Sequence, residues 1–383
     1  MSTAFAGTSW SQSAASYWPN AQQLRLLKAA LLTGPAALEA WQQWQAAVDV
    51  DTVDVGTQRL LPLLAHNLRA QGVSDDDLAR FKGLLRYTWA ANQRRMMQVG
   101  PVVAALHAAS IPTMLLKGMA LAQHYYQNVG LRPMDDVDLL VPFESAHQAI
   151  DVLRRLSWRP LGANADPALG HARSFVHSSG CQIDLHWHSQ WEFCGRDDDA
   201  EIWAHSETAT IGRTHVRVVS AADLLLQTIV HGCRWNSVPP IRWVADALLV
   251  VRQQEHRVEW PRFVSQVRAH QLVLPVRRAL EFLVEAFAAP VPADVISNLQ
   301  DYRAQSFERI EQRMREWTSP AVGCFPLVIC HHVRLTRRDG VLRMASRLPR
   351  YLQYTYDLPS LRALPGALYT RAARRLKAAT APS

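Results

Sequence analysis

Apolar side chains recur three and four residues apart along the first part of the chain, which is the period of a helix with one buried face. Between residues 21 and 110 this pattern predicts a series of helices. Ser74 and the aspartates after it are typical of a helix start, because they cap the first turn and favour the positive end of the helix dipole. The segments with this pattern are AQQLRLLKAALL, ALEAWQQWQAAV, RLLPLLAHNLRAQG and DLARFKGLLRYTWAANQRRMMQVGPVVAALHAA.

The hydrophobic pattern changes at Ile111, where a short apolar run ends at Lys117 and Gly118 and a helical stretch follows. Beyond it, alternating or fully apolar runs predict strands, and one longer periodic segment predicts a helix. A turn at Ser178-Ser179-Gly180 joins two of the strands. The predicted strands lie within 111–116, 136–141, 174–189 and 214–220, and the predicted helix covers 143–158.

The helical period returns at Ala221 and continues into the C-terminal part of the chain. These changes predict three regions, with the strands confined to the middle one. They are a helical region over 1–110, an α/β domain over 111–220, and a helical region with a basic tail over 221–383.

Composition fits a globular chain, since 49% of the residues are hydrophobic and 19% are charged. No apolar run is long enough for a transmembrane helix, and the first residues lack the pattern of a signal peptide. The five cysteines form no CxxC pair, so neither a cysteine zinc site nor a disulfide framework is indicated. We therefore expect a cytoplasmic protein without membrane insertion.

Positive charge is concentrated at the C-terminal end. Residues 331–383 hold 11 Arg and Lys against two Asp, a local net charge of +9, while the whole chain carries +8. The rest of the chain therefore sums to about −1. Only four residues of the chain are Lys, so Lys117 stands out in a sequence that otherwise uses Arg.

Two carboxylates mark the predicted strand over 136–141. Asp136 and Asp138 share one face because successive strand residues point to opposite sides of a sheet. Such a pair repels itself without a cation, and carboxylate oxygens are preferred ligands of Mg²⁺. The alternative is that either group lies in water at a strand end or caps the next helix.

The turn before this strand has features of a phosphate site. Gly118 lies between a predicted strand and a predicted helix, where backbone N–H groups bind phosphate. Lys117 beside it is a compact point charge suited to phosphate or to proton transfer. The alternative for Lys117 is an ordinary surface residue.

A third carboxylate follows in the segment IDLHWHS, where Asp184, His186 and His188 share one strand face. One interpretation is a transition-metal site that contains histidine. Another is a half-buried strand with one hydrated face. We favour a third, in which Asp184 joins Asp136 and Asp138 while His186 lines the pocket or orients a carboxylate.

Together these segments resemble the nucleotidyltransferase superfamily of the DNA polymerase beta type, and more closely an uncharacterised bacterial nucleotidyltransferase family. The resemblance covers about residues 85–260. The wider superfamily has Gly-Ser or Gly-Gly where this chain has Gly118-Met119, and its spacing from the glycine to the aspartates is shorter. The matching segments are LKG at 116–118, Tyr126, RPMDDVDLLV at 132–141, IDLHW at 183–187, DLLL at 223–226, HG at 231–232 and RWVAD at 242–246.

The resemblance implies an α+β fold in which a small mixed-sheet domain is flanked by helical regions. It also implies transfer of a nucleoside monophosphate from a triphosphate such as ATP, with Mg²⁺, or alternatively Mn²⁺, as cofactor. Asp136 and Asp138 would bridge two ions, and Asp184 would hold the ion nearer the nucleophile. The implied nucleotide-binding residues are Lys117, Gly118, Met119 and Arg132, and further candidates are Arg173, His177, His186 and His231.

The acceptor stays open between RNA, protein and a small molecule, because known relatives modify each of these. Two other functions also stay open. One is a catalytically silent protein that binds nucleotide or RNA on the same fold, against which the three aspartates argue. The other is an RNA-binding protein that uses the basic tail, whose phosphate contacts would make binding strongly dependent on salt.

Overall fold

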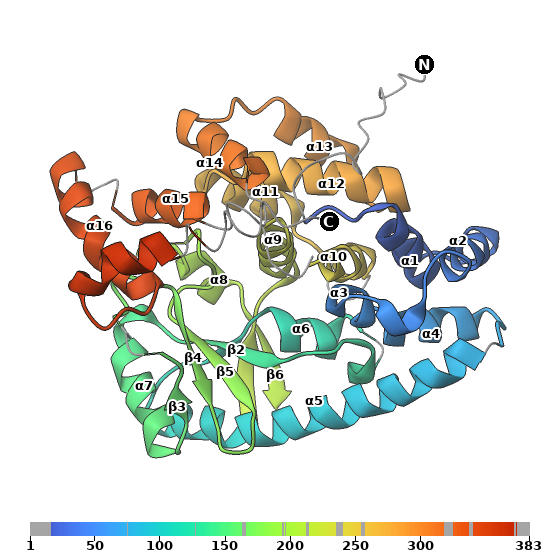
Figure 1. The fold of residues 1–383 in the computed structure, drawn as a ribbon, viewed down its shortest axis with the longest axis horizontal. Coiled ribbons are helices and arrows are strands. Elements are labelled where there is room, and N and C mark those ends of the chain that lie inside the picture. Colours follow the sequence, from blue (N-terminus) through green and yellow to red (C-terminus); the bar gives the residue numbers. More distant parts are fainter. Residues whose placement is uncertain are drawn as a thin grey trace.

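The computed structural model describes residues 17–74, 76–126, 128–162, 166–193, 195, 197–211, 214–234, 240–253, 257–317, 325–336, 340–370 and 373. Asp75, Cys194, Cys324 and most of the basic tail after Thr370 lie outside these residues. A seven-stranded mixed sheet is flanked by helices that precede and follow it in the chain (Figure 1). The predicted α+β fold is confirmed.

Short helices open the chain, and one long helix follows them. The long helix α5 begins within the predicted Asp cluster and runs beneath the sheet (Figure 1). It contacts β2, β6, β7 and the helix α7, so the last predicted helix of the N-terminal region packs on the α/β domain. The elements are α1 (Ala21–Leu31), α2 (Pro35–Gln45), η2 (Val50–Thr52), α3 (Val55–Gln58), α4 (Leu61–Ala70) and α5 (Asp76–Ala108).

The sheet has the order β3-β4-β5-β2-β1-β7-β6. The β1–β7 and β2–β5 pairs are parallel, and the other neighbouring pairs are antiparallel. Gly180, with a φ of 82°, closes the predicted turn between β4 and β5 in the left-handed region that glycine adopts readily. The strands are β1 (Met114–Leu115), β2 (Asp136–Leu140), β3 (Arg159–Pro160), β4 (Ala172–Val176), β5 (Gln182–His186), β6 (Glu207–Ile211) and β7 (Thr214–Val218).

Helices connect the strands, and α6 contacts both β2 and the helix α9, so it lies between the sheet and the C-terminal helices. The connecting elements are α6 (Lys117–His124), η3 (Val129–Leu131), η4 (Phe143–Ser145), α7 (Ala146–Arg155) and α8 (Ala200–Ala204). The C-terminal elements are α9 (Ala221–Gly232), α10 (Arg242–Arg252), α11 (Trp260–Ala269), α12 (Val273–Phe287), α13 (Ala293–Gln300), α14 (Ser306–Trp317), α15 (Phe325–Thr336), α16 (Val341–Thr355) and η6 (Leu361–Ala363).

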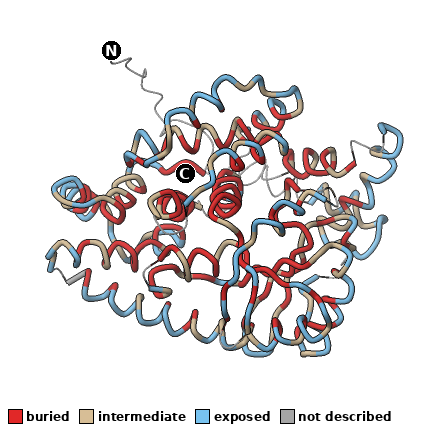
Figure 2. Tube along the Cα trace, turned by 180° about the vertical axis from the view of Figure 1, so that it is seen from behind, coloured by how far each residue is buried: buried red, intermediate tan, exposed pale blue. Residues whose placement is uncertain are grey.

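One apolar core joins all three predicted regions. Trp44 of α2, Leu139 of β2 and Leu224 of α9 belong to the same buried cluster, which extends along the chain from Tyr17 to Leu299. Buried positions follow the inner faces of the helices and both central strands (Figure 2). Among the described residues, no helix combines the length and the apolar character that crossing a membrane requires.

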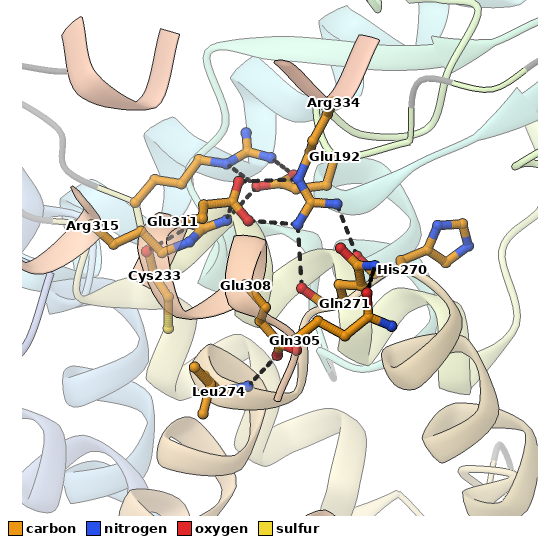
Figure 3. A network of polar contacts seen from close by, with 11 residues as sticks. Glu192, Cys233, His270, Gln271, Leu274, Gln305, Glu308, Glu311, Arg315 and Arg334 are labelled. Carbon is orange, nitrogen blue, oxygen red and sulfur yellow. Dashed lines mark hydrogen bonds and ion pairs between the residues drawn. The ribbon is translucent and has the colours of Figure 1, made fainter. Parts of the chain in front are cut away.

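Buried ion pairs attach the last helices to the loop after β5 (Figure 3). Arg315 on α14 donates from Nη2 to Glu192 Oε1 at 2.7 Å, and Arg234 after α9 pairs with the same carboxylate. Glu311 on α14 accepts from Nε of Arg334 on α15 at 3.1 Å and lies 3.7 Å from Arg315. Isolated charges cannot be buried without a large cost, so these groups hold one another in place.

We expect Arg315→Met to lower the free energy of unfolding by about 3–5 kcal/mol, because Glu192 and Glu311 then lose a buried partner. Urea denaturation followed by circular dichroism measures this loss. The control is Arg154→Met, which removes an ion pair whose side chains are 54% and 59% exposed and should change stability by less than about 1 kcal/mol. Equal effects of the two substitutions would contradict the anchoring role of the network.

Candidate active site

The parallel pairing of β2 with β5 brings the predicted carboxylates together. Asp138 lies directly opposite Asp184 in this register, and Leu140 lies opposite His186. Neighbouring strands are about 4.8 Å apart, so equivalent side chains on one face are close enough to share a ligand. Asp136, two residues earlier on β2, lies on the same face of the sheet as Asp138.

Asp138, Asp184 and His186 form a group suited to a metal ion. Each offers one ligand atom, and these atoms lie within 4.8 Å of one another. Two carboxylate oxygens and an imidazole nitrogen are donors that divalent ions such as Mg²⁺ or Mn²⁺ accept, with the nitrogen favouring Mn²⁺. The site thus combines the histidine of the transition-metal interpretation with the clustered aspartates of the interpretation that we favoured.

The ring of His186 is held by both of its nitrogens. Nδ1 lies 3.2 Å from the backbone oxygen of His188, which only accepts hydrogen bonds, so Nδ1 donates there. Nε2 lies 2.9 Å from Oδ1 of Asp138. A backbone hydrogen bond on one nitrogen that aims the other is the usual arrangement around a metal-binding histidine.

Asp138 is buried and has two cationic or polar partners. The Lys117 ammonium lies 3.4 Å from its Oδ1, the same oxygen that faces His186. Burial would raise the pKa of Asp138, but the charge of Lys117 and the hydrogen bond with His186 outweigh it and hold the pKa well below its usual range. Asp138 is therefore ionised at neutral pH.

Asp136 has the opposite electrostatic environment. Burial first, and then the charges of Asp138 and Asp184, raise the pKa of Asp136 to about 6. The structure thus separates two carboxylates of one strand, one paired with a cation and one repelled by its neighbours. A divalent ion between them would remove that repulsion.

Helix α6 directs its N-terminus into the site. It begins at Lys117, two residues before the predicted start, and Leu116 at its N-cap position has no side-chain hydrogen bond to the first turn. The first backbone N–H groups of α6 are therefore available to an anion. A Cβ atom at Gly118 would lie 3.3 Å from both Arg132 Nη1 and Met134 Sδ, so glycine permits this close packing.

A cavity of about 260 Å³ lies at the site formed by the aspartates and the start of α6. It lies between the strands β2 and β5 and the helices α6, α9 and α10, and residues of and beside α3 close another side of it. Its lining brings together the sequence-predicted Lys117, Gly118, Arg132, Asp136, Asp138, Asp184 and His231. The other lining residues are Gly56, Arg59, Leu121, Met134, Asp135, Thr228, Gly232, Pro240, Arg242, Trp243 and Asp246.

Arg132 is part of a buried ion pair on one wall of the cavity. Its Nε and Nη2 donate to the two oxygens of Asp246 on α10, both at 2.8 Å, and Nη1 donates to the backbone oxygen of Gly118 at 3.3 Å. Tyr126 donates its hydroxyl to Asp246 at 2.7 Å. Arg242 lies 3.9 Å from Asp246 as the i,i+4 spacing indicates, but Asp246 is buried and the pair does not lie on the surface.

The sequence profile of a family described as an uncharacterised nucleotidyltransferase matches residues 53–288, more than half of the chain. The chain belongs to this family. The resemblance found in the motifs is thereby confirmed. Among curated proteins, none matches the chain.

Two solved structures are similar to this nucleotidyltransferase-family chain at low identity. The antibiotic-resistance factor ANT(2'')-Ia has 14% identity and a TM-score of 0.33, with 49% of this chain and 95% of the other covered. An antigenic nucleotidyltransferase-like protein from Paracoccidioides brasiliensis has 15% identity and a TM-score of 0.34, with 55% of this chain and 94% of the other covered.

The sequence also singled out Met119, Arg173, His177 and His231, and of these four only His231 lines the cavity. Met119 is fully buried on α6 and does not line the cavity. Arg173 on β4 donates to the backbone oxygen of Gly162, and His177 contacts Ser179 in the β4–β5 turn. His231 lines the cavity, and the charge of Lys117 lowers its pKa to about 3.

Sequence reasoning missed part of the cavity wall. Asp246 and Arg242 carry the i,i+4 signal of a surface pair, and only the packing of α10 against α9 and the hydrogen bond from Arg132 to Asp246 show that they are internal. Arg59 pairs with Asp135 at the cavity, and no motif near Arg59 indicates this. The polar positions of α9 also differ from a solvated face, since Asp223 is buried and paired with Arg262.

We expect Asp136→Asn to raise the melting temperature of the metal-free protein at neutral pH. The pKa of Asp136 is raised to about 6, so the folded state binds a proton that the unfolded chain releases near pH 4. Ionising Asp136 as the pH rises through 6 therefore lowers stability, and asparagine avoids this loss. The gain should be largest above pH 6 and shrink as the pH falls toward 4.

Differential scanning fluorimetry in EDTA between pH 4 and 8 measures this effect, with the exposed neighbour substitution Asp135→Asn as the control. A gain of equal size at every pH would contradict the electrostatic origin. Adding Mn²⁺ should reverse the order of the two melting temperatures, because the Asp136 carboxylate adds to the attraction of the site for the ion and an asparagine does not.

Proposed function

We propose that this family member transfers a nucleoside monophosphate from a nucleoside triphosphate to a hydroxyl group of an acceptor. The observation that carries the proposal is the meeting of Asp138, Asp184 and His186 within 4.8 Å. Both aspartates line a pocket together with Asp136 and the N-terminus of α6, and His186 lies buried behind them. The same pocket thus offers ligands for a divalent cation and donors for phosphate.

A divalent ion fits these residues because Asp136 is repelled by its neighbours and the ligand atoms are of the right type. Asp138, Asp184 and His186 would hold it, with Asp136 beside them to share a second one. When bound, the ions would lower the pKa of the attacking hydroxyl and stabilise the charge on the leaving oxygen. Mg²⁺ is the proposed cofactor, with Mn²⁺ as the ion that an imidazole ligand suits better.

The residues of the chain would bind and orient the triphosphate. Lys117 and the free N–H groups of α6 neutralise and position the phosphates. Arg132 and Arg242 share the single carboxylate of Asp246, so this wall keeps a net positive charge toward the phosphates. The contact from Arg132 to the Gly118 carbonyl couples this charge to the start of α6.

The proposed step exchanges one bond at phosphorus for another. The acceptor oxygen forms a bond to the α-phosphorus, and the bond from that phosphorus to the bridging oxygen breaks. Pyrophosphate leaves with the electron pair of the broken bond, and Asp184 accepts the proton of the acceptor hydroxyl. The products are pyrophosphate and an acceptor that carries one nucleoside monophosphate.

Incubation with each α-³²P-labelled triphosphate and a divalent ion tests this proposal. A cytoplasmic lysate, separated into RNA, protein and small molecules after the reaction, supplies the acceptor. Label in one fraction, together with release of pyrophosphate, is expected only when the ion is present. No label in any fraction with any triphosphate would leave a binding protein on a nucleotidyltransferase fold.

We expect Asp138→Asn to lower transfer more than about 100-fold, because the substitution removes the carboxylate that Lys117 and His186 orient. Circular dichroism should show an unchanged fold. In contrast to Asp136→Asn, this substitution should not raise the melting temperature, since the charge of Asp138 is favourably paired. Full activity of the Asp138→Asn protein would exclude the metal-dependent mechanism.

We expect His186→Gln to weaken Mn²⁺ binding by about 10–100-fold and Mg²⁺ binding by less, because an imidazole ligand favours the softer ion. Electron paramagnetic resonance of free Mn²⁺ measures the affinity without any nucleotide. His177→Gln in the β4–β5 turn is the control and should bind as the wild type does. Unchanged Mn²⁺ affinity of the His186→Gln protein would limit His186 to holding Asp138 in place.

A further inference from the structure

A long part of the chain carries only positive charge. Between Leu78 and Met134 there are seven Arg and Lys residues and no Asp or Glu. Five of the seven lie on α5, and the other two are Lys117 and Arg132 of the cavity. The long helix beneath the sheet and the proposed active site thus belong to one segment of uniform charge sign.

The charges on α5 face outward. Lys82, Arg86 and Arg94 are exposed, and among the described residues none of them forms an ion pair. Their positions fall on the half of the helix that points away from the sheet, since the buried Phe81, Asn92 and Val99 define the opposite half. With a rise of 1.5 Å per residue, Lys82 and Arg94 lie about 18 Å apart along the helix axis.

Aromatic side chains lie between these charges. Tyr87 is 70% exposed and Trp89 is 47% exposed, values that are high for large apolar residues in a protein with an extensive core. Tyr87 and Arg94 are seven residues apart and lie in one row along the helix. Trp89 and Lys82 are also seven residues apart and lie in a second row, on the other flank of the exposed half. Exposed aromatic rings beside unpaired cations are the groups by which proteins stack bases and contact phosphates of single-stranded nucleic acid.

Side chains on the inner half and the flank of α5 connect this helix to the mouth of the cavity, directly beside the exposed Arg94. Trp89 packs beside Gly130 of η3, the turn that leads into the aspartate strand. Asn92 donates to the backbone oxygen of Arg132 at 2.9 Å, and Arg95 donates from Nε to that of Asp135 at 3.4 Å. Asp135 lines the cavity next to Asp136, so a strand bound along α5 lies close to the proposed site.

We propose that the acceptor is single-stranded RNA and that the outer face of α5 binds it, with Tyr87 and Trp89 stacking bases and Lys82, Arg86 and Arg94 contacting phosphates. This inference rests on the proposed nucleotidyl transfer, since it names the acceptor of that reaction. A ribose hydroxyl oxygen of the bound RNA would form the bond to the α-phosphorus, pyrophosphate would leave with the electron pair of the broken bond, and Asp184 would take the proton. The RNA would gain one nucleoside monophosphate.

The composition of this face favours RNA over a membrane or a second copy of the chain. A helix that lies on a membrane presents a broad apolar face, whereas the apolar half of α5 packs against the sheet. A second copy would bring the same positive charge against itself. The C-terminal basic region is a separate surface, because Arg334 is buried against Glu311 and no described residue from 331 onward lines the cavity.

Fluorescence anisotropy of a labelled 12-nucleotide RNA of mixed sequence, in EDTA and without triphosphate, tests the surface independently of catalysis. The main variant is the triple substitution Lys82→Gln, Arg86→Gln and Arg94→Gln, and the matched control is Arg343→Gln, Arg347→Gln and Arg362→Gln in the C-terminal region. Both variants remove the same charge from exposed positions. Circular dichroism checks that each remains folded.

We expect the α5 variant to bind RNA at least about 30-fold more weakly, and the slope of log affinity against log salt to become shallower by about 2, as the loss of three phosphate contacts requires. The control should change affinity by less than about 3-fold. Tyr87→Ala should weaken binding about 10-fold and leave the salt slope unchanged, because stacking is not an ionic contact.

Equal losses in the α5 variant and in the control would overturn the proposal, since binding would then follow net charge alone. Binding of wild type to anionic vesicles but not to RNA, or a dimer that only the α5 variant dissolves, would overturn it in favour of another partner. If RNA binds through α5 but accepts no label from any triphosphate, the surface stands and the proposed transfer fails. If label reaches protein or small molecules instead, the transfer stands and this acceptor is wrong.

Discussion

The pairing of β2 with β5 forces like charges together, and much of the surrounding structure compensates for this. The parallel register sets Asp138 against Asp184 and leaves Asp136 next to both. Lys117, His186 and the N-terminus of α6 supply positive charge or hydrogen bonds to one side of this group. Lys117 compensates Asp136 only in part, so burial and the repulsion by Asp138 and Asp184 still raise the pKa of Asp136. A cluster of this kind is costly as a structural element, and its oxygen and nitrogen donors match those of a cation site.

Arginine holds the helical regions onto the sheet domain. Arg132 joins the segment before β2 to α10 through Asp246, and Arg262 of α11 joins Asp223 of α9. Arg315 repeats the pattern between α14 and the loop after β5. The planar guanidinium satisfies both carboxylate oxygens and neighbouring carbonyls at once, which a lysine in the same place does not. The strong preference of this chain for Arg over Lys therefore has a visible structural use.

The sequence contains enough information for the fold class, for the family and for the residues at the centre of the cavity. Strand alternation places Asp136 with Asp138, and the family motif adds Asp184 and Lys117. The edge strand β3 escapes detection because it has only 2 residues, and β6 escapes detection because it carries exposed polar residues at most of its positions. The burial of Asp246 and Asp223 also escapes detection, since a helical pattern with i,i+4 charges is the same for an exposed pair and for one covered by another helix. The position of Met119 depends on where α6 starts, which local pattern sets only to within a few residues.

Helix α6 has an open first turn, and this has a thermodynamic consequence. A helix whose initial N–H groups lack a side-chain cap is weaker than it would be with serine or aspartate at the N-cap position, typically by about 1 kcal/mol. Leu116 occupies the N-cap position of α6 and makes no side-chain hydrogen bond there, so the helix lacks that stabilisation. An anion that occupies the turn completes the helix as a cap would, so part of its binding free energy becomes folding free energy of this segment. In the proposed function, the nucleotide would therefore act as a removable structural component of α6, and local order around Gly118 would depend on the concentration of triphosphate.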